Sequence, residues 1–233
     1  MKYKMIKKYC SLFTASVLLT GSMTAAAVET ALTVAAETTA ETSADSSRVS
    51  DEAQSEGPAD TADAQSGRYS DSSDGGHAIE ADGAEVSYSG ITVTKTGEAE
   101  GDEADFYGEN AAVFAENGAS LTVKDAEVTT DGTHANGIFS YGEGTVVRIS
   151  DSEIHTSGNC SGGLMVTGGG TLEAENLTIH TTGNSSAAIR SDRGGGTETI
   201  TGGSYTTDGT GSPVIYSTAD VTVSDAVLVS TAS

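Results

Sequence analysis

The sequence predicts an all-β fold, a right-handed parallel β-helix (a solenoid) of about six coils, and two observations support this. An eight-residue phrase recurs along the chain, and its apolar residues alternate with polar ones, which is the period of a half-buried strand. The copies begin at Gly90, Asp125, Asp151, Asn176, Gly202 and Asp225, the last four steps being 26, 25, 26 and 23 residues. They read "GITVTKTG", "DAEVTTDG", "DSEIHTSG", "NLTIHTTG", "GGSYTTDG" and "DAVLVSTA". A period near 25 residues fits one coil, in which equivalent residues stack and the copies share one core.

Four columns of apolar residues run in step with this phrase and predict the inward face of each coil. The first column is Ile79, Val113, Ile138, Leu164, Ile189 and Ile215. The two columns before the phrase are Val86, Leu121, Val147, Leu172, Glu198 and Val221, and Tyr88, Val123, Ile149, Ala174, Ile200 and Val223. The column within the phrase is Val93, Val128, Ile154, Ile179, Tyr205 and Leu228. Glu198 breaks its column. Gly-rich breaks such as "TGGGT" fall between the strands, where tight corners need positive φ.

The N-terminal part predicts export. "MKYKMIKKYC" carries four lysines and is followed by an apolar run and small residues that end at Ala27, which is typical of a secretory signal in residues 1–27. The apolar run is short for a membrane anchor, so we expect no membrane insertion after cleavage and an extracellular or cell-surface location. Residues 28–76 are rich in Ser, Thr, Ala and acids and predict a disordered linker. Residues 77–233 are the predicted β-helix.

The net charge limits the classes of ligand that the protein can bind, and the cysteine content limits its disulfides. Four lysines of the 11 basic residues leave with the signal, so 34 acids face seven bases and the mature net charge is −27. This charge disfavours nucleic acid, anionic membranes and acidic polysaccharides. The cysteines are Cys10, within the signal, and Cys160, so we expect no disulfide within the mature chain.

The columns, the "TTDG" turns and the run "GSPVIYSTADVTVSDAVLVSTAS" resemble adhesin-like right-handed parallel β-helix proteins secreted by bacteria. The likeness covers residues 77–233. It implies an extracellular role in surface attachment or in contact with carbohydrate or a surface protein, without a defined catalytic set. The alternative is a polysaccharide-degrading β-helix enzyme, a lyase or glycosidase.

A row of mostly large side chains is the candidate binding site. If the first apolar column faces inward, its next neighbours face outward. The candidate ligand-binding residues are Phe114, Phe139, Met165, Arg190 and Tyr216, in line with Glu80. Contiguous exposed apolar surface marks contact with a partner. The competing interpretation is that the inserted loop covers the row through Phe106 and Tyr107.

Other candidates for chemistry are weaker. His155 and His180 share an outward position on adjacent coils, but two ligands make a weak metal site. The acidic insertion "EAEGDEADFYGE", residues 98–109, offers oxygens that suit calcium, without the spacing of a known calcium loop. Asp192 lies with Arg190 and Arg193, yet the repeat places no second carboxylate opposite it. We therefore expect a non-catalytic protein with no cofactor and no metal.

The last phrase, "DAVLVSTAS", reaches Ser233 without a polar cap. Terminal coils of solenoids need caps. We therefore expect further polypeptide beyond Ser233.

Overall fold

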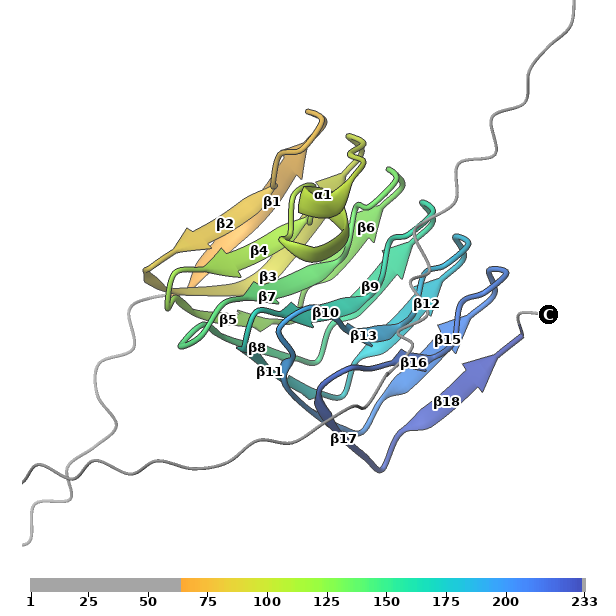
Figure 1. Cartoon of the computed structure of the whole chain (residues 1–233). Helices are drawn as coiled ribbons and strands as arrows, with labels where there is room; N and C mark the ends of the chain where they lie inside the picture. Colours follow the sequence, from red (N-terminus) through yellow and green to blue (C-terminus); the bar gives the residue numbers. More distant parts are fainter. Residues whose placement is uncertain (1–63, 232–233) are drawn as a thin grey trace, which may run out of the picture. The chain divides into compact units, whose positions relative to one another are not determined.

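The computed structural model describes residues 64–231 as a parallel β-solenoid of about six turns (Figure 1). The predicted signal and the linker up to residue 63 lie outside the described residues. Each turn contributes three strands, and all strand pairs are parallel. The predicted fold is confirmed.

The first stack of strands forms a six-stranded sheet. It consists of β2 (Ile79–Asp82), β4 (Val113–Glu116), β7 (Ile138–Tyr141), β10 (Leu164–Thr167), β13 (Ile189–Ser191) and β16 (Ile215–Tyr216). Their register pairs Val113 with Ile138, Ile138 with Leu164, and so on through Ile215, as the first apolar column predicts.

The other two stacks join in a twelve-stranded sheet through the long strand β3 (Glu85–Lys95), which contributes to both. On one side of β3 lie β5 (Ser120–Lys124), β8 (Val146–Ser150), β11 (Gly170–Glu175), β14 (Gly196–Thr201) and β17 (Asp220–Ser224). On the other lie β6 (Glu127–Thr130), β9 (Glu153–Thr156), β12 (Thr178–Thr181), β15 (Ser204–Thr207) and β18 (Val227–Ser230).

The solenoid begins earlier than the sequence suggests. Strand β1 (Gln65–Asp71) pairs with β3, although residues 65–71 were expected to belong to the linker. The boundary expected at residue 76 is therefore wrong. The one large apolar side chain of β1 is Tyr69, which packs edge to face on Tyr88 with ring centroids 5.3 Å apart. One tyrosine in a Ser- and Asp-rich segment gives no periodicity to detect.

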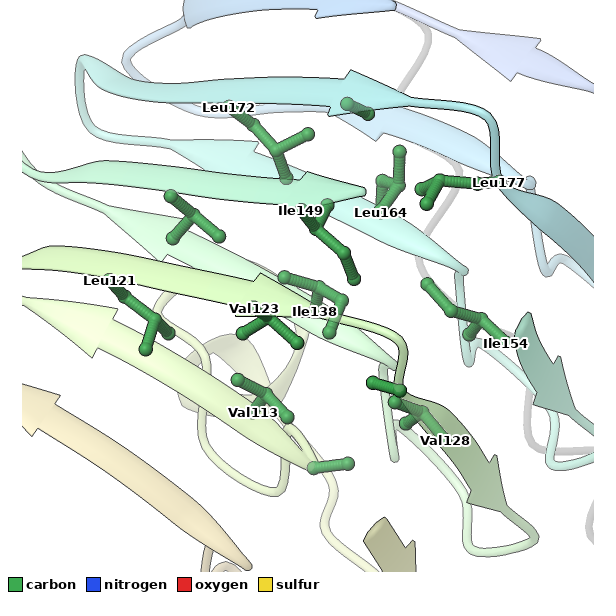
Figure 2. Packing of buried hydrophobic residues seen from close by; sticks show 14 of the residues in the cluster. Val113, Leu121, Val123, Val128, Ile138, Ile149, Ile154, Leu164, Leu172 and Leu177 are labelled. Carbon is green, nitrogen blue, oxygen red and sulfur yellow. The ribbon is translucent and has the colours of Figure 1, made fainter. Parts of the chain in front are cut away.

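The four predicted inward columns form one hydrophobic core. Residues such as Val113, Ile138 and Leu164 are fully buried between the sheets (Figure 2). Burial of such side chains stabilises a fold by about 1.5–3 kcal/mol each. Ladders of buried threonines add hydrogen bonds at one corner: the Oγ1 atoms of Thr156 and Thr181 donate to the carbonyls of Ser161 and Ser186 at 2.7 and 2.6 Å.

The residue types at the first and last positions of the repeated phrase follow from two different structural requirements. Its first residue turns the chain between two strands with positive φ, as at Asp151 (49°) and Asn176 (54°), and Asn, Asp and Gly tolerate this conformation best. Its last residue is a close approach: a Cβ on Gly158 or Gly183 would collide with the carbonyl oxygen of the equivalent glycine one coil earlier. The phrase therefore needs glycine at its end.

Cys160 is buried and disulfide-bonded. The sequence predicts no disulfide, because Cys10 lies in the predicted signal, which is cleaved.

Candidate functional site

The predicted aromatic row lies on the outer side of the sheet formed by β4, β7, β10, β13 and β16, but much of it is covered. Phe114 is 4% exposed, and Phe139 and Met165 are fully buried. Together with Ala111 they form a second hydrophobic cluster, separate from the main core, against which Tyr141 packs. The expectation that these three side chains are exposed is wrong, although their direction out of the solenoid is right.

The cover is the acidic insertion, residues 98–109, which contains the short helix α1 (Asp102–Phe106; Figure 1). Phe106 is 6% exposed. Its carbonyl oxygen accepts a hydrogen bond of 2.6 Å from the Thr167 hydroxyl on β10. Tyr107 meets Tyr141 edge to face at 5.7 Å, and Gly108 lies so close to the Phe114 ring that a Cβ would collide with it. The insertion, hereafter the lid, is thus fixed to three coils.

A buried pair of side chains anchors the other side of the lid. His134 is buried, its Nδ1 lies 2.9 Å from the carbonyl oxygen of Ala99, and its Nε2 lies 2.9 Å from Oδ1 of Asp105. The His134 ring thus connects two residues of the lid to the coil that carries it. The Asp105 side chain is only 11% exposed. The sequence treats the acidic residues of the insertion as solvent-exposed, and therefore does not predict the contact between Asp105 and His134.

The open end of the row is formed by Arg190 and Tyr216. Tyr216 is 38% exposed. The guanidinium of Arg190 lies 5.9 Å from the ring centroids of both Phe106 and Tyr216, and its Nη2 donates to Asp192 at 2.9 Å. Of the five predicted ligand-binding residues, these two remain able to reach a partner without movement of the lid.

The lid also brings a second carboxylate to the Asp192 region. Arg193 Nη1 donates to Oδ2 of Asp102, which is 91 residues away in the sequence, at 2.9 Å. The hydrogen bond that Arg193 donates to Asp102, followed by its hydrogen bond with Tyr107, raises the pKa of the Arg193 guanidinium. Sequence periodicity cannot find Asp102, because it lies in the segment that interrupts the repeat. Asp102 and Asp192 are each paired with an arginine, Arg193 and Arg190, at 2.9 Å.

His155 and His180 occupy the same position on adjacent coils, as predicted, with ring centroids 5.2 Å apart and ring planes tilted by 58°. His180 Nε2 contacts Asp208 Oδ2 at 2.7 Å, and the Asp208 pKa is lowered by hydrogen bonds from Thr231 and then from His180. Among residues 64–231, no group of three or more His, Cys, Asp or Glu side chains is placed to hold a metal ion. Within the lid, Asp102 and Asp105 are already paired with Arg193 and His134.

A shallow groove of about 520 Å³ runs across the outer face of β5, β8, β11 and β14. Its floor carries two adjacent columns of polar side chains from successive coils. The columns are Thr122, Arg148, Glu173 and Thr199, and Ser150, Glu175 and Thr201. Arg148 Nε and Glu173 Oε2 form an ion pair of 2.8 Å in which both side chains remain about half exposed. We call this surface the Arg148 groove.

Sequence reasoning overlooked the Arg148 groove because each coil contributes an ordinary surface residue to it. A second groove, of about 670 Å³, follows the corner where the phrase begins. It is more acidic, being lined by Asp125, Glu127, Asp151 and Glu153.

The residue that breaks the core pattern, Glu198, is fully buried, and neither carboxylate oxygen has a hydrogen-bond partner. Burial raises its pKa well above the usual value. The hydroxyl of Tyr205, on the next strand of the same coil, is also buried without a partner, and burial raises its pKa to about 12. Burial therefore favours the neutral form of both groups, and they mark a weak point in the core rather than a solvent-accessible site.

Among the described residues, no helix has the length and apolar character required to cross a membrane. No protein-family model, curated protein or solved structure matches the chain.

Proposed function

We propose that this protein is a non-catalytic, adhesin-like β-helix module that works outside the cell and binds a neutral polysaccharide along the Arg148 groove. The observation that carries the proposal is the groove itself: two uncovered polar columns, one over four successive coils and one over three, run in register. Stacked strands lie about 4.8 Å apart, so each column offers a polar hydrogen-bonding side chain at a regular interval along the solenoid. A repeating polymer can use such a surface several times.

The chemistry of the groove favours hydroxyl-rich ligands. Threonine and serine hydroxyls donate and accept hydrogen bonds, Arg148 adds a charged donor, and Glu173 and Glu175 add charged acceptors. Arg148 and Glu173 are about half exposed. The volume of the groove lies in the range of about 300–1,000 Å³ that is usual for ligand sites. The formal net charge of −23 repels acidic polymers, which leaves neutral glycans as the favoured class.

The exposed Tyr216, with the partly buried Arg190 beside it, is the second candidate contact. An exposed tyrosine beside a guanidinium can stack on a sugar ring or on a side chain of a surface protein. This surface is smaller than the Arg148 groove because the lid covers the rest of its row.

The enzymatic alternative is a polysaccharide lyase or glycosidase that acts at Asp192. A specific observation favours it as the second function: the lid brings Asp102 to Arg193, beside the Arg190–Asp192 pair. Hydrolysis requires one carboxyl group that donates a proton. Since both carboxylates are held by arginines, neither is prepared for that role, and binding remains the better-supported function.

The test is a binding panel of neutral and acidic polysaccharides with the purified protein and two double variants. Arg148→Ala with Glu173→Ala should abolish retention of the bound glycan. Arg68→Ala with Glu80→Ala removes the same charges from exposed positions elsewhere and should leave binding unchanged. Equal loss in both double variants would exclude the groove as the site.

The same panel distinguishes the enzyme. A binding module releases no reducing ends or unsaturated sugars from any glycan. Saturable cleavage that disappears in Asp192→Asn or Arg193→Ala would replace this proposal with the enzymatic one.

A further inference from the structure

The Arg148 groove is longer along the solenoid axis than along its strands. Along the axis it crosses β5, β8, β11 and β14, which are neighbours in the sheet. Three steps of about 4.8 Å between these strands give a length of about 14 Å. Along the strands, the floor is two outward residues wide, such as Glu173 and Glu175, which lie about 7 Å apart in an extended strand. A polymer that contacts both columns of the groove repeatedly therefore runs parallel to the axis, across the strands.

The floor of the groove is regular. Its longer column pairs one to one, without a register shift, through three successive strand pairings, from Thr122 to Thr199. The side chains of both columns are exposed, except that Ser150 is half-buried. The same two outward positions thus recur once per coil on an uninterrupted sheet surface. A ligand that contacts every coil must have a repeat close to that of the coil.

The ion pair between Arg148 and Glu173 lies in the middle of this floor. It joins Nε of the guanidinium and Oε2 of the carboxylate at 2.8 Å, and both side chains remain about half exposed. The other guanidinium N–H groups and the second carboxylate oxygen can therefore bond a ligand. Two neighbouring hydroxyl groups of one sugar ring suit this pair, because a hydroxyl can accept a hydrogen bond from Arg148 and donate one to Glu173. A ring that carries its hydroxyl groups at its edge presents such a pair to the floor.

We infer, on the basis of the proposed function, that the glycan bound by the Arg148 groove is an extended chain of neutral hexopyranose units joined by equatorial bonds, as in cellulose. In such a chain the rings form a flat ribbon, and each unit advances by nearly the rise of one coil. Successive rings then meet successive coils with their hydroxyl edges. A glucan with axial linkages curves into a helix, so it leaves the floor after one or two units. The floor thus selects the linkage of the glycan as well as its lack of charge.

The length of the floor limits how many sugar units contribute to binding. Four coils offer four positions along the longer column. Affinity should therefore rise from cellobiose to cellotetraose and then change by less than twofold to cellohexaose. Thr199 and Thr201 form one end of the floor, so their hydroxyl groups should matter only for ligands that are long enough to reach them.

The test is titration calorimetry of the purified full chain with cellohexaose and maltohexaose, glucose hexamers that differ only in their linkage. We expect cellohexaose to bind at least tenfold more tightly. Equal or tighter binding of maltohexaose, lost in Arg148→Ala with Glu173→Ala, would overturn the inference and leave the proposed function in place. Absence of binding to cellohexaose and to its β-linked mannose counterpart would also overturn it, and the panel of neutral glycans then decides the proposed function separately.

Two double variants locate the ligand along the groove. Thr199→Val with Thr201→Val keeps the shape of the side chains, removes the hydroxyl groups at one end of the floor, and should weaken binding of cellotetraose at least threefold while leaving cellobiose nearly unchanged. Thr129→Val with Thr178→Val removes two exposed hydroxyl groups from the outer face of β6 and β12 and should change neither. Unchanged binding of cellotetraose in the first variant, or weaker binding in the second, would contradict a chain that lies along the four coils of the Arg148 groove.

Discussion

The N-terminal and C-terminal halves of this solenoid are built from one repeat, but they differ in the segments that cover the core and the outer face. In the N-terminal half, β1 covers the end of the core and the lid covers Phe114 and Phe139 on the outer face. In the C-terminal half, Tyr216 and Leu228 are exposed, and Glu198 and Tyr205 lie in the core without hydrogen-bond partners. The repeat supplies the same positions to both halves. What differs is the covering segments, which lie outside the repeat.

The largest expected effect tests the covered half. Phe139→Ala should lower the free energy of unfolding by about 3–5 kcal/mol, the usual cost of deleting a buried aromatic side chain. Chemical denaturation followed by circular dichroism measures it. A loss below 1 kcal/mol would show that the lid does not bury this ring in solution.

The attachment of the lid is the next feature to test. Asp105→Ala removes the buried 2.9 Å contact between Oδ1 of Asp105 and Nε2 of His134 and should lower the free energy of unfolding by about 1–3 kcal/mol. Asp105→Asn keeps an acceptor oxygen at the same place and should lose less. Hydrogen exchange gives the specific readout: amides of residues 98–109 should exchange faster in Asp105→Ala, while those of β12 and β15 stay unchanged.

Replacing the buried polar side chain Glu198 in the C-terminal half should increase the stability of the protein. Glu198→Leu restores the apolar column and should raise the free energy of unfolding at pH 7 by about 1–3 kcal/mol, since it removes a buried carboxyl group without a partner. Denaturant titrations of both proteins at the same pH measure this gain. A lower stability would mean that the carboxyl group has a bonding role.

The same substitution should change the pH dependence. The folded-state pKa of Glu198 lies above its usual value of 4.5. Below pH 4.5 the carboxyl group is protonated in both the folded and the unfolded chain, so its ionisation does not lower the stability of the fold. As pH rises above 4.5, the unfolded chain releases this proton while the folded chain retains it, and stability falls until the folded-state pKa is reached. Glu198→Gln, which keeps the polar volume, should remove this decline without the full gain of Glu198→Leu.

The smallest expected effect is at the open end of the aromatic row. Tyr216→Ala should change the free energy of unfolding by less than about 0.5 kcal/mol, because an exposed side chain contributes little to the core. It should weaken binding of any partner that uses the Arg190–Tyr216 surface, measured by the glycan panel or by a protein pull-down. A large loss of stability would place Tyr216 under a cover that the described residues do not include.

The sequence by itself determined the solenoid, its period and its four inward columns. These follow from local alternation and from stacking of equivalent residues, so they can be read one coil at a time. Even Glu198 was visible as an exception, although its complete burial was not.

Only the tertiary structure decided which outward residues are free. Phe139 and Tyr216 have the same place in the repeat, and their exposures are 0% and 38% because the lid reaches one and not the other. The contacts of the lid join residues 29, 61 and 91 positions apart, with no periodic signal between them. The Arg148 groove is likewise invisible in any one coil, because it exists only where four coils lie side by side.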